Sequence, residues 1–256
     1  MPVTKQILNR MNILTGVVSL ALAGLAGYLM NRSSYQLFTG LLTRDELASK
    51  ATTVFVPAIH AVYDIELRWA VVAILLLGAI VPLLAATRNR KQYEIALGKK
   101  VMLWRWIDIA VVGGLMLMTV ALISGVQDFM TLKLVGGLVV IASLLGWQTE
   151  RQNAEGGKSV WATYVLALVA GFLPVLLISA YAVGTPLYGM VRSPWFVYAL
   201  YGTTVLTFVL SALNLFYQLR RFRAWAKYEV VERNYQVISL ASRLTFAVLL
   251  IIGLKK

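Results

Sequence analysis

The chain contains no cysteine and only one histidine, His60, among its 256 residues. The lack of cysteine excludes disulfides, thiolate nucleophiles and cysteine-based metal sites. A single histidine also excludes a helical pair of imidazoles for zinc. Asp64 and Glu66 lie near His60 in the sequence, but this spacing matches no established metal-binding pattern. We therefore expect no metal site in this protein.

Charged residues are scarce as well, at 14% of the chain, whereas soluble domains contain about 25%. Hydrophobic residues make up 59%, and the mean hydropathy is +0.75. These values predict an integral membrane protein. Acidic residues are the scarcer charged class, with 11 Asp and Glu against 24 Lys and Arg. In a membrane protein this excess of cations favours contact with lipid headgroups, so we expect membrane lipids as partners and no nucleic acid.

Seven apolar runs are long enough to cross a bilayer as helices, which takes about 20 residues. They cover residues 13–30, 69–86, 106–124, 129–147, 160–183, 195–216 and 235–254. No linker divides them, so we predict a single domain over residues 1–256, an all-α membrane protein built as a bundle of seven transmembrane helices. The first run also resembles a secretory signal peptide, but its length favours a helix that stays in the membrane.

Two local patterns refine this prediction. The first connection, residues 31–66, is long and polar, and alternating segments such as Thr52–Val56 favour a short β-hairpin. The fifth run contains Pro174, which predicts a kinked but continuous helix, because neighbours in a bilayer can satisfy the carbonyl that proline leaves free.

Lys and Arg concentrate at the N-terminus and in the loops after the second, fourth and sixth runs, all on one side of the membrane. This distribution predicts a plasma-membrane protein with a cytoplasmic N-terminus and an outside C-terminus. The loop after the sixth run interleaves aromatic residues with Arg220, Arg221, Arg223 and Lys227. Headgroup contact is the simplest explanation of this basic loop, and a cytoplasmic protein partner would also meet it.

Arg243 is the only formal charge inside the last apolar run. A guanidinium at membrane depth costs several kcal/mol unless another group compensates it, which makes Arg243 a candidate functional residue. The third run offers Asp108 at a comparable depth. We predict an ion pair between these two helices, because arginine and carboxylate compensate each other well. In the alternative, Asp108 pairs with Arg105 on its own helix and Arg243 extends towards the interface.

Several short sequence fragments occur along the chain in a distinctive order and at distinctive spacings. They are Asn9-Arg10, Arg105-Trp106-Ile107-Asp108, Gly146-Trp147 with Glu150, Ala170-Gly171 with Pro174, Pro194 with Phe196-Val197-Tyr198, and Glu232-Arg233 with Tyr235, Ser239 and Leu240. With them, nearly the whole chain resembles the heliorhodopsins, the inverted relatives of microbial rhodopsins. The resemblance implies a rhodopsin-like bundle with a cytoplasmic N-terminus and a long first outside loop.

In the heliorhodopsins, a lysine of the seventh helix links retinal as a Schiff base, and a carboxylate of the third helix is its counterion. By this resemblance the carboxylate corresponds to Asp108, and the lysine corresponds to Arg243, four residues after the matching Ser239. A guanidinium stays protonated at physiological pH and does not form such a linkage. We therefore expect no covalent cofactor, while retinal or another apolar ligand could still bind non-covalently.

A proton relay needs groups that titrate near the working pH, and Asp108 is the only such group in the apolar runs. We therefore expect no proton pumping, and the chain shows no motif of an enzyme. Three functions stay open. The first is a non-pumping protein without covalent retinal, with a sensory, regulatory or scaffold role. The second is a photoreceptor that binds retinal, a carotenoid or another lipid non-covalently. The third is a small transporter that uses Arg243 to bind anions or carboxylates. Each of these could form a homodimer.

Overall fold

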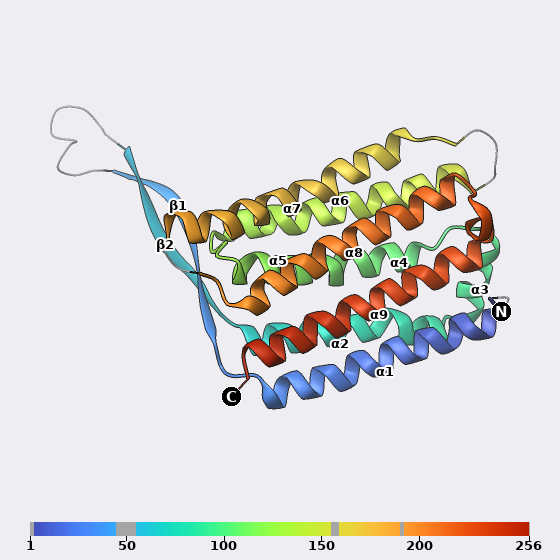
Figure 1. Ribbon diagram of the computed structural model, residues 1–256, viewed down its shortest axis with the longest axis horizontal. Coiled ribbons are helices and arrows are strands. Elements are labelled where there is room, and N and C mark those ends of the chain that lie inside the picture. Colours follow the sequence, from blue (N-terminus) through green and yellow to red (C-terminus); the bar gives the residue numbers. More distant parts are fainter. Residues whose placement is uncertain (1–2, 45–54, 155–158, 190–191, 256) are drawn as a thin grey trace.

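The computed structural model describes residues 3–44, 55–154, 159–189 and 192–255. Seven helices in this part of the chain are long and apolar enough to cross a membrane, which confirms the predicted bundle. They run side by side (Figure 1). They are α1 (Lys5–Leu29), α2 (Leu67–Ala86), the segment Leu103–Ile123, α6 (Phe129–Asn153), α7 (Ala162–Tyr188), α8 (Trp195–Leu219) and α9 (Tyr228–Gly253).

The third spanning segment has three parts. These are α4 (Leu103–Asp108), the π-helical turn η2 (Ile109–Gly113) and α5 (Gly114–Ile123). A π turn inserts an extra residue into the helical repeat and frequently occurs at functional sites. Here it begins immediately after Asp108.

The helices continue beyond the apolar runs, most clearly at the end of the bundle that holds the N-terminus, called the N-terminal end below. α1 starts at residue 5 rather than 13, α6 ends at residue 153 rather than 147, and α9 starts at residue 228 rather than 235. Hydropathy marks where side chains become polar, which is not where the backbone hydrogen bonds of a helix end. The short helix α3 (Arg90–Gly98) and the 3₁₀ turn η3 (Arg223–Ala226) lie at this end too (Figure 1).

A β-hairpin occupies the first long connection, as predicted. Strands β1 (Ser34–Arg44) and β2 (Phe55–Glu66) pair antiparallel, with a bulge between Leu37 and Phe38. The hairpin projects from the opposite end of the bundle (Figure 1), and its strands are longer than the sequence indicated. Residues 52–54 of the predicted segment lie outside the described residues. The backbone N–H of Phe38 donates to the carbonyl of Gln127 at 3.0 Å, which ties the hairpin to the turn before α6.

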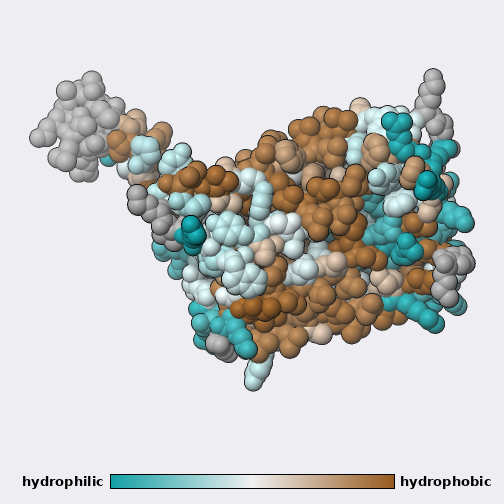
Figure 2. Space-filling view, in the orientation of Figure 1, coloured by the Kyte–Doolittle hydropathy of each residue, from teal (hydrophilic) through white to brown (hydrophobic). Residues whose placement is uncertain are grey.

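α1 is an integral part of the bundle. It packs against α2 and α9, and Leu8 and Ala26 on its inner face are fully buried. The first apolar run therefore forms a helix of the bundle, as predicted. α7 is continuous through Pro174, also as expected. Figure 2 shows the apolar side chains around the middle of the bundle and hydrophilic ones towards its ends, which is the pattern of a multi-pass membrane protein.

Candidate functional site

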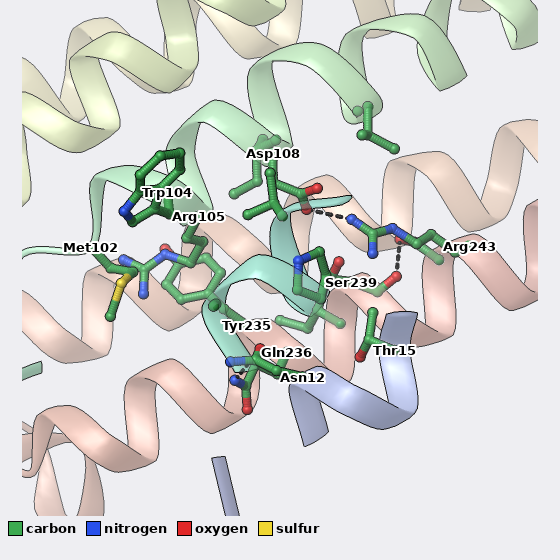
Figure 3. A pocket seen from close by; sticks show the side chains of 18 of the residues that line it. Asn12, Thr15, Met102, Trp104, Arg105, Asp108, Tyr235, Gln236, Ser239 and Arg243 are labelled. Atoms are coloured by element: carbon green, nitrogen blue, oxygen red, sulfur yellow. Dashed lines mark hydrogen bonds and ion pairs between the residues drawn. The ribbon is translucent and has the colours of Figure 1, made fainter. Parts of the chain in front are cut away.

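Arg243 and Asp108 meet in the interior of the bundle. Arg243 belongs to α9 and is 2% exposed, and Asp108 ends α4 and is 8% exposed. Nη2 of Arg243 donates to Oδ2 of Asp108 in a direct ion pair (Figure 3). Arg105, the alternative partner of Asp108, contacts two other carboxylates instead. Asp108 of the third apolar run and Arg243 of the seventh therefore compensate each other between helices.

Helix α2 supplies a second acceptor for the guanidinium. Nη1 of Arg243 donates to the backbone carbonyl of Gly78 at 2.7 Å. In a regular helix this carbonyl would accept from the N–H of residue 82, but residue 82 is a proline and has none. Pro82 thus leaves the Gly78 carbonyl free, and Arg243 satisfies it, as neighbouring helices can do in a bilayer.

Gly78 also leaves space for the guanidinium. A Cβ at this position would lie 3.2 Å from Nε of Arg243 and 3.4 Å from Cγ1 of Val112. Gly78→Val should therefore lower the free energy of unfolding by about 1–3 kcal/mol, the usual range for overpacking, seen as a lower melting temperature in detergent. Gly202→Val is the matched control, because a Cβ at Gly202 meets no atom within 4 Å. Equal losses in the two variants would contradict this account of Gly78.

A cavity of about 130 Å³ borders the ion pair, which is room for several water molecules. Most of its wall surface is apolar, but it is called the polar cavity below because several charged, amide and hydroxyl side chains line it. Side chains of α1, α2, α4, α8 and α9 line it, among them Asp108, Arg243 and Ser239 (Figure 3). Oδ1 of Asp108 is buried and has no hydrogen-bond partner among the described residues. The three residues that the resemblance singled out therefore line one cavity, and one carboxylate oxygen of Asp108 is buried beside it without a partner among the described residues.

A larger, apolar cavity of about 200 Å³ lies among η2, α5, α6, α7, α8 and α9. Its walls are mainly aliphatic and aromatic, with a row of threonines on α8 at Thr203, Thr204 and Thr207. These hydroxyls donate to backbone carbonyls one turn earlier on α8, at 2.8–3.0 Å, so they present little free polarity to the cavity. The polar and apolar cavities adjoin, because both are lined by Ile109, Gly113, Met116, Thr207, Ser211, Tyr235 and Ser242.

A second buried ionic group, the Arg105 cluster, lies nearer the N-terminal end of the bundle. It consists of Arg105 of α4, Glu150 of α6 and Glu232 of α9, all at most 9% exposed. Nη2 of Arg105 donates to Glu150 and Nη1 donates to Glu232. The guanidinium also lies 4.0 Å from the centre of the Tyr235 ring, a cation–π contact. One cation therefore holds two carboxylates from different helices.

Uncharged groups donate further hydrogen bonds to the carboxylates of Glu150 and Glu232. Glu150 accepts from the N–H of Met102 at 3.1 Å, Nε1 of Trp106 at 2.9 Å and the hydroxyl of Tyr228 at 3.0 Å. Glu232 accepts from the hydroxyl of Tyr93 in α3 at 3.1 Å. Burial, followed by the negative charge of Glu232, raises the pKa of the Tyr93 phenol, so it stays protonated and donates. These contacts fasten α3, α4, α6 and α9 together at one point.

The basic loop folds as a compact turn at the N-terminal end of the bundle. Arg221 and Arg223 have positive φ angles of 48° and 46°, and the guanidinium of Arg220 lies 5.2 Å from the centre of the Trp161 ring. Trp225 anchors the turn by donating from Nε1 to Oδ1 of Asn214 at 2.8 Å. Arg220, Arg221, Arg223 and Lys227, all within the described part of the chain, line neither cavity. The structure therefore separates this loop from the Asp108–Arg243 site.

A sequence model of the heliorhodopsin family matches residues 8–254 of this chain, nearly its full length. The chain belongs to the heliorhodopsin family. A comparison with curated proteins finds no match.

In this heliorhodopsin-family protein, sequence reasoning found the Asp108–Arg243 pair but gave no role to Glu150 and Glu232. By hydropathy both residues fall in loops, because the fourth apolar run ends at residue 147 and the seventh starts at residue 235. One signal could have found Glu232. Together with Gln236, Ser239 and Arg243 it forms a stripe at spacings of four, three and four residues, which is one face of a helix. That polar stripe extends α9 back beyond residue 235.

Proposed function

We propose that this heliorhodopsin-family protein carries no covalently bound retinal. The observation that supports the proposal most directly is that α9 contains no lysine. Arg243 stands where the family resemblance puts the linking lysine, four residues after Ser239. Attack on an aldehyde needs an amine that can lose its proton, and the guanidinium keeps its proton. Because Arg243 also binds Asp108 and the Gly78 carbonyl, the residues present do not fit a covalent retinal.

We further propose that the protein does not pump protons or catalyse a reaction, and that it acts as a sensory, regulatory or scaffold protein. Asp108 is paired with a permanent cation, which leaves the pair little range for acid–base exchange. Glu150 and Glu232 are held in the same way by Arg105. A relay needs groups that gain and lose protons in turn, and these interactions oppose such cycling.

The proposed location is the plasma membrane, with the N-terminal end of the bundle in the cytoplasm. The distribution of Lys and Arg in the sequence supports this orientation. It places the basic loop and η3 at the inner leaflet, where anionic headgroups attract Lys and Arg. A cytoplasmic partner protein would meet the molecule at the same face.

The absence of covalent retinal can be tested by adding all-trans retinal to the purified protein. We expect no pigment that absorbs in the visible and is bleached by hydroxylamine, because no amine of α9 is available for linkage. Illuminated cells or liposomes that contain the protein should show no light-driven change in pH. A visible pigment that hydroxylamine destroys would contradict the proposal, since it would reveal a covalent linkage elsewhere on the chain.

A second candidate function, non-covalent binding of an apolar ligand, is supported by the apolar cavity. Its walls, mainly aliphatic and aromatic, favour an apolar ligand such as retinal, a carotenoid or another lipid, and its volume of about 200 Å³ adjoins the polar cavity. A reversible pigment that resists hydroxylamine would favour this function. Transport of anions has less support, because Asp108 already neutralises Arg243 and leaves no net positive charge for an anion.

A further inference from the structure

Helix α4 carries one member of each buried ionic group. Arg105 binds Glu150 and Glu232. Asp108, one turn later on the same helix, binds Arg243 (Figure 3). α4 has only six residues, and the π turn η2 follows it directly. A displacement of α4 would therefore move a member of both ionic groups at once.

Helix α5, on the other side of η2, is held in a different way. Its buried side chains are mostly apolar, and four of them belong to the hydrophobic core of the bundle: Leu117, Val120, Ala121 and Leu122. α4 is held by its two arginine–carboxylate contacts and by hydrogen bonds to Glu150 from Met102 and Trp106. The π turn thus separates a part that polar contacts hold from a part that apolar packing holds.

Two glycines, Gly113 and Gly114, lie where η2 meets α5, and close packing requires neither of them. A Cβ at Gly113 would lie 3.7 Å from its nearest neighbour, and one at Gly114 would lie 3.8 Å away, which are ordinary van der Waals distances. On the neighbouring helix α6, a Cβ at Gly136 or Gly146 would come within 2.7 or 2.4 Å of a side chain. A glycine inside a helix costs about 0.5–1 kcal/mol relative to alanine, because it leaves the backbone more freedom. Gly113 and Gly114 therefore make this junction deformable.

We propose that η2 and Gly113-Gly114 form a hinge that couples the Asp108–Arg243 pair to the Arg105 cluster. When the pair breaks, α4 loses one of its two ionic contacts and moves on the hinge, which loosens the contacts of Arg105. The hinge gives the sensory or regulatory role proposed above a path from the interior of the bundle towards its N-terminal end. The inference rests on that role only for its use, because the coupling is measurable in the purified protein.

Backbone hydrogen exchange, followed by mass spectrometry on the full-length protein in detergent, tests the coupling. Asp108→Ala removes the contact with Arg243. We expect residues 147–153, the end of α6 that carries Glu150, to exchange at least about fivefold faster than in the wild type. Peptides of α7, which belongs to neither ionic group, are the reference for general loosening. If Asp108→Ala does not fold, Arg243→Gln breaks the same pair from α9.

A stiffer hinge separates this path from others. Gly113→Ala/Gly114→Ala fits the space at the junction and favours a regular helix, so in this background Asp108→Ala should speed the exchange of residues 147–153 by less than about twofold. The matched control is Gly24→Ala/Gly202→Ala. A Cβ at either of these glycines meets no atom within 4 Å, and both lie outside the third spanning segment, so this control should keep the full effect.

Three results would overturn the inference. Unchanged exchange of residues 147–153 after the pair is broken would mean that the two groups are not coupled. An equal increase in α7 would mean a general loss of stability. An equal increase with and without the alanines at residues 113 and 114 would mean that the coupling runs by another path, such as along α9. The sensory or regulatory role would survive each of these results, since none of them tests what the protein responds to.

Discussion

Arg105→Met should lower the free energy of unfolding by at least about 3–5 kcal/mol, the range for removing one partner of a buried ion pair. Arg105 is the one cation that contacts Glu150 and Glu232 in the described structure, and all three side chains are almost fully buried. Its loss would leave two carboxylates from α6 and α9 unpaired and facing each other across the cluster. Folded proteins are stable by only about 5–15 kcal/mol, so we expect a large drop in melting temperature or in yield of folded protein.

The triple variant Arg105→Met/Glu150→Gln/Glu232→Gln tests the cause of this loss. It removes both negative charges together with the positive one, and it should recover much of the stability, because uncharged groups of similar size often replace a buried ionic group well. Arg90→Met is the surface control. Arg90 pairs with Glu94 at 3.1 Å, but its side chain is 51% exposed, so its removal should cost less than about 1 kcal/mol.

The melting curves distinguish a structural role of charge from simple loss of packing. If the triple variant is no more stable than Arg105→Met, the long side chain of Arg105 matters for its contacts with Tyr235 and Trp106 rather than for its charge. If Arg105→Met melts like the wild type, the cluster is not a fastening point of the bundle at all.

The same cluster shows what could be predicted from the sequence and what could not. Long apolar runs determine the number of helices, since each must satisfy its own backbone in the bilayer, and the Asp108–Arg243 pair followed from the cost of two charges at that depth. The Arg105 cluster lies where hydropathy no longer distinguishes helix from loop. Glu150 and Glu232 look like hydrated loop residues until the extra turns of α6 and α9 bring them together.

The contact between Arg243 and Gly78 could not be predicted from the sequence, for a different reason. Pro82 indicates a free carbonyl at Gly78, but no rule of spacing says which side chain of which helix will satisfy it. That depends on the rotation of α2 against α9, which is set by packing over the whole bundle. The cavities depend on packing in the same way, so their volumes and shared walls could not be derived from the sequence.

Arg243→Lys should form a visible pigment with all-trans retinal, whereas we expect the wild-type protein to form none. A buried lysine can lose its proton and attack an aldehyde, which a guanidinium does not do. Asp108, already in contact with residue 243, would compensate the positive charge of the linked form. The apolar cavity adjoins this position through Ser242 and provides space for the body of the ligand. The measurement is an absorption spectrum before and after hydroxylamine, which should bleach the pigment.

Two variants identify the origin of the colour. Arg243→Gln offers no amine and should stay colourless, which excludes linkage to surface lysines. Arg243→Lys/Asp108→Asn keeps the amine but removes the anion, so its pigment should be shifted towards the ultraviolet, as expected when the linked nitrogen loses its proton. A folded Arg243→Lys protein that remains colourless would mean that residue 243 is not the linkage position of the family. The guanidinium would then be an ordinary structural partner of Asp108 and Gly78, and the linkage position of the family would correspond to another residue of α9.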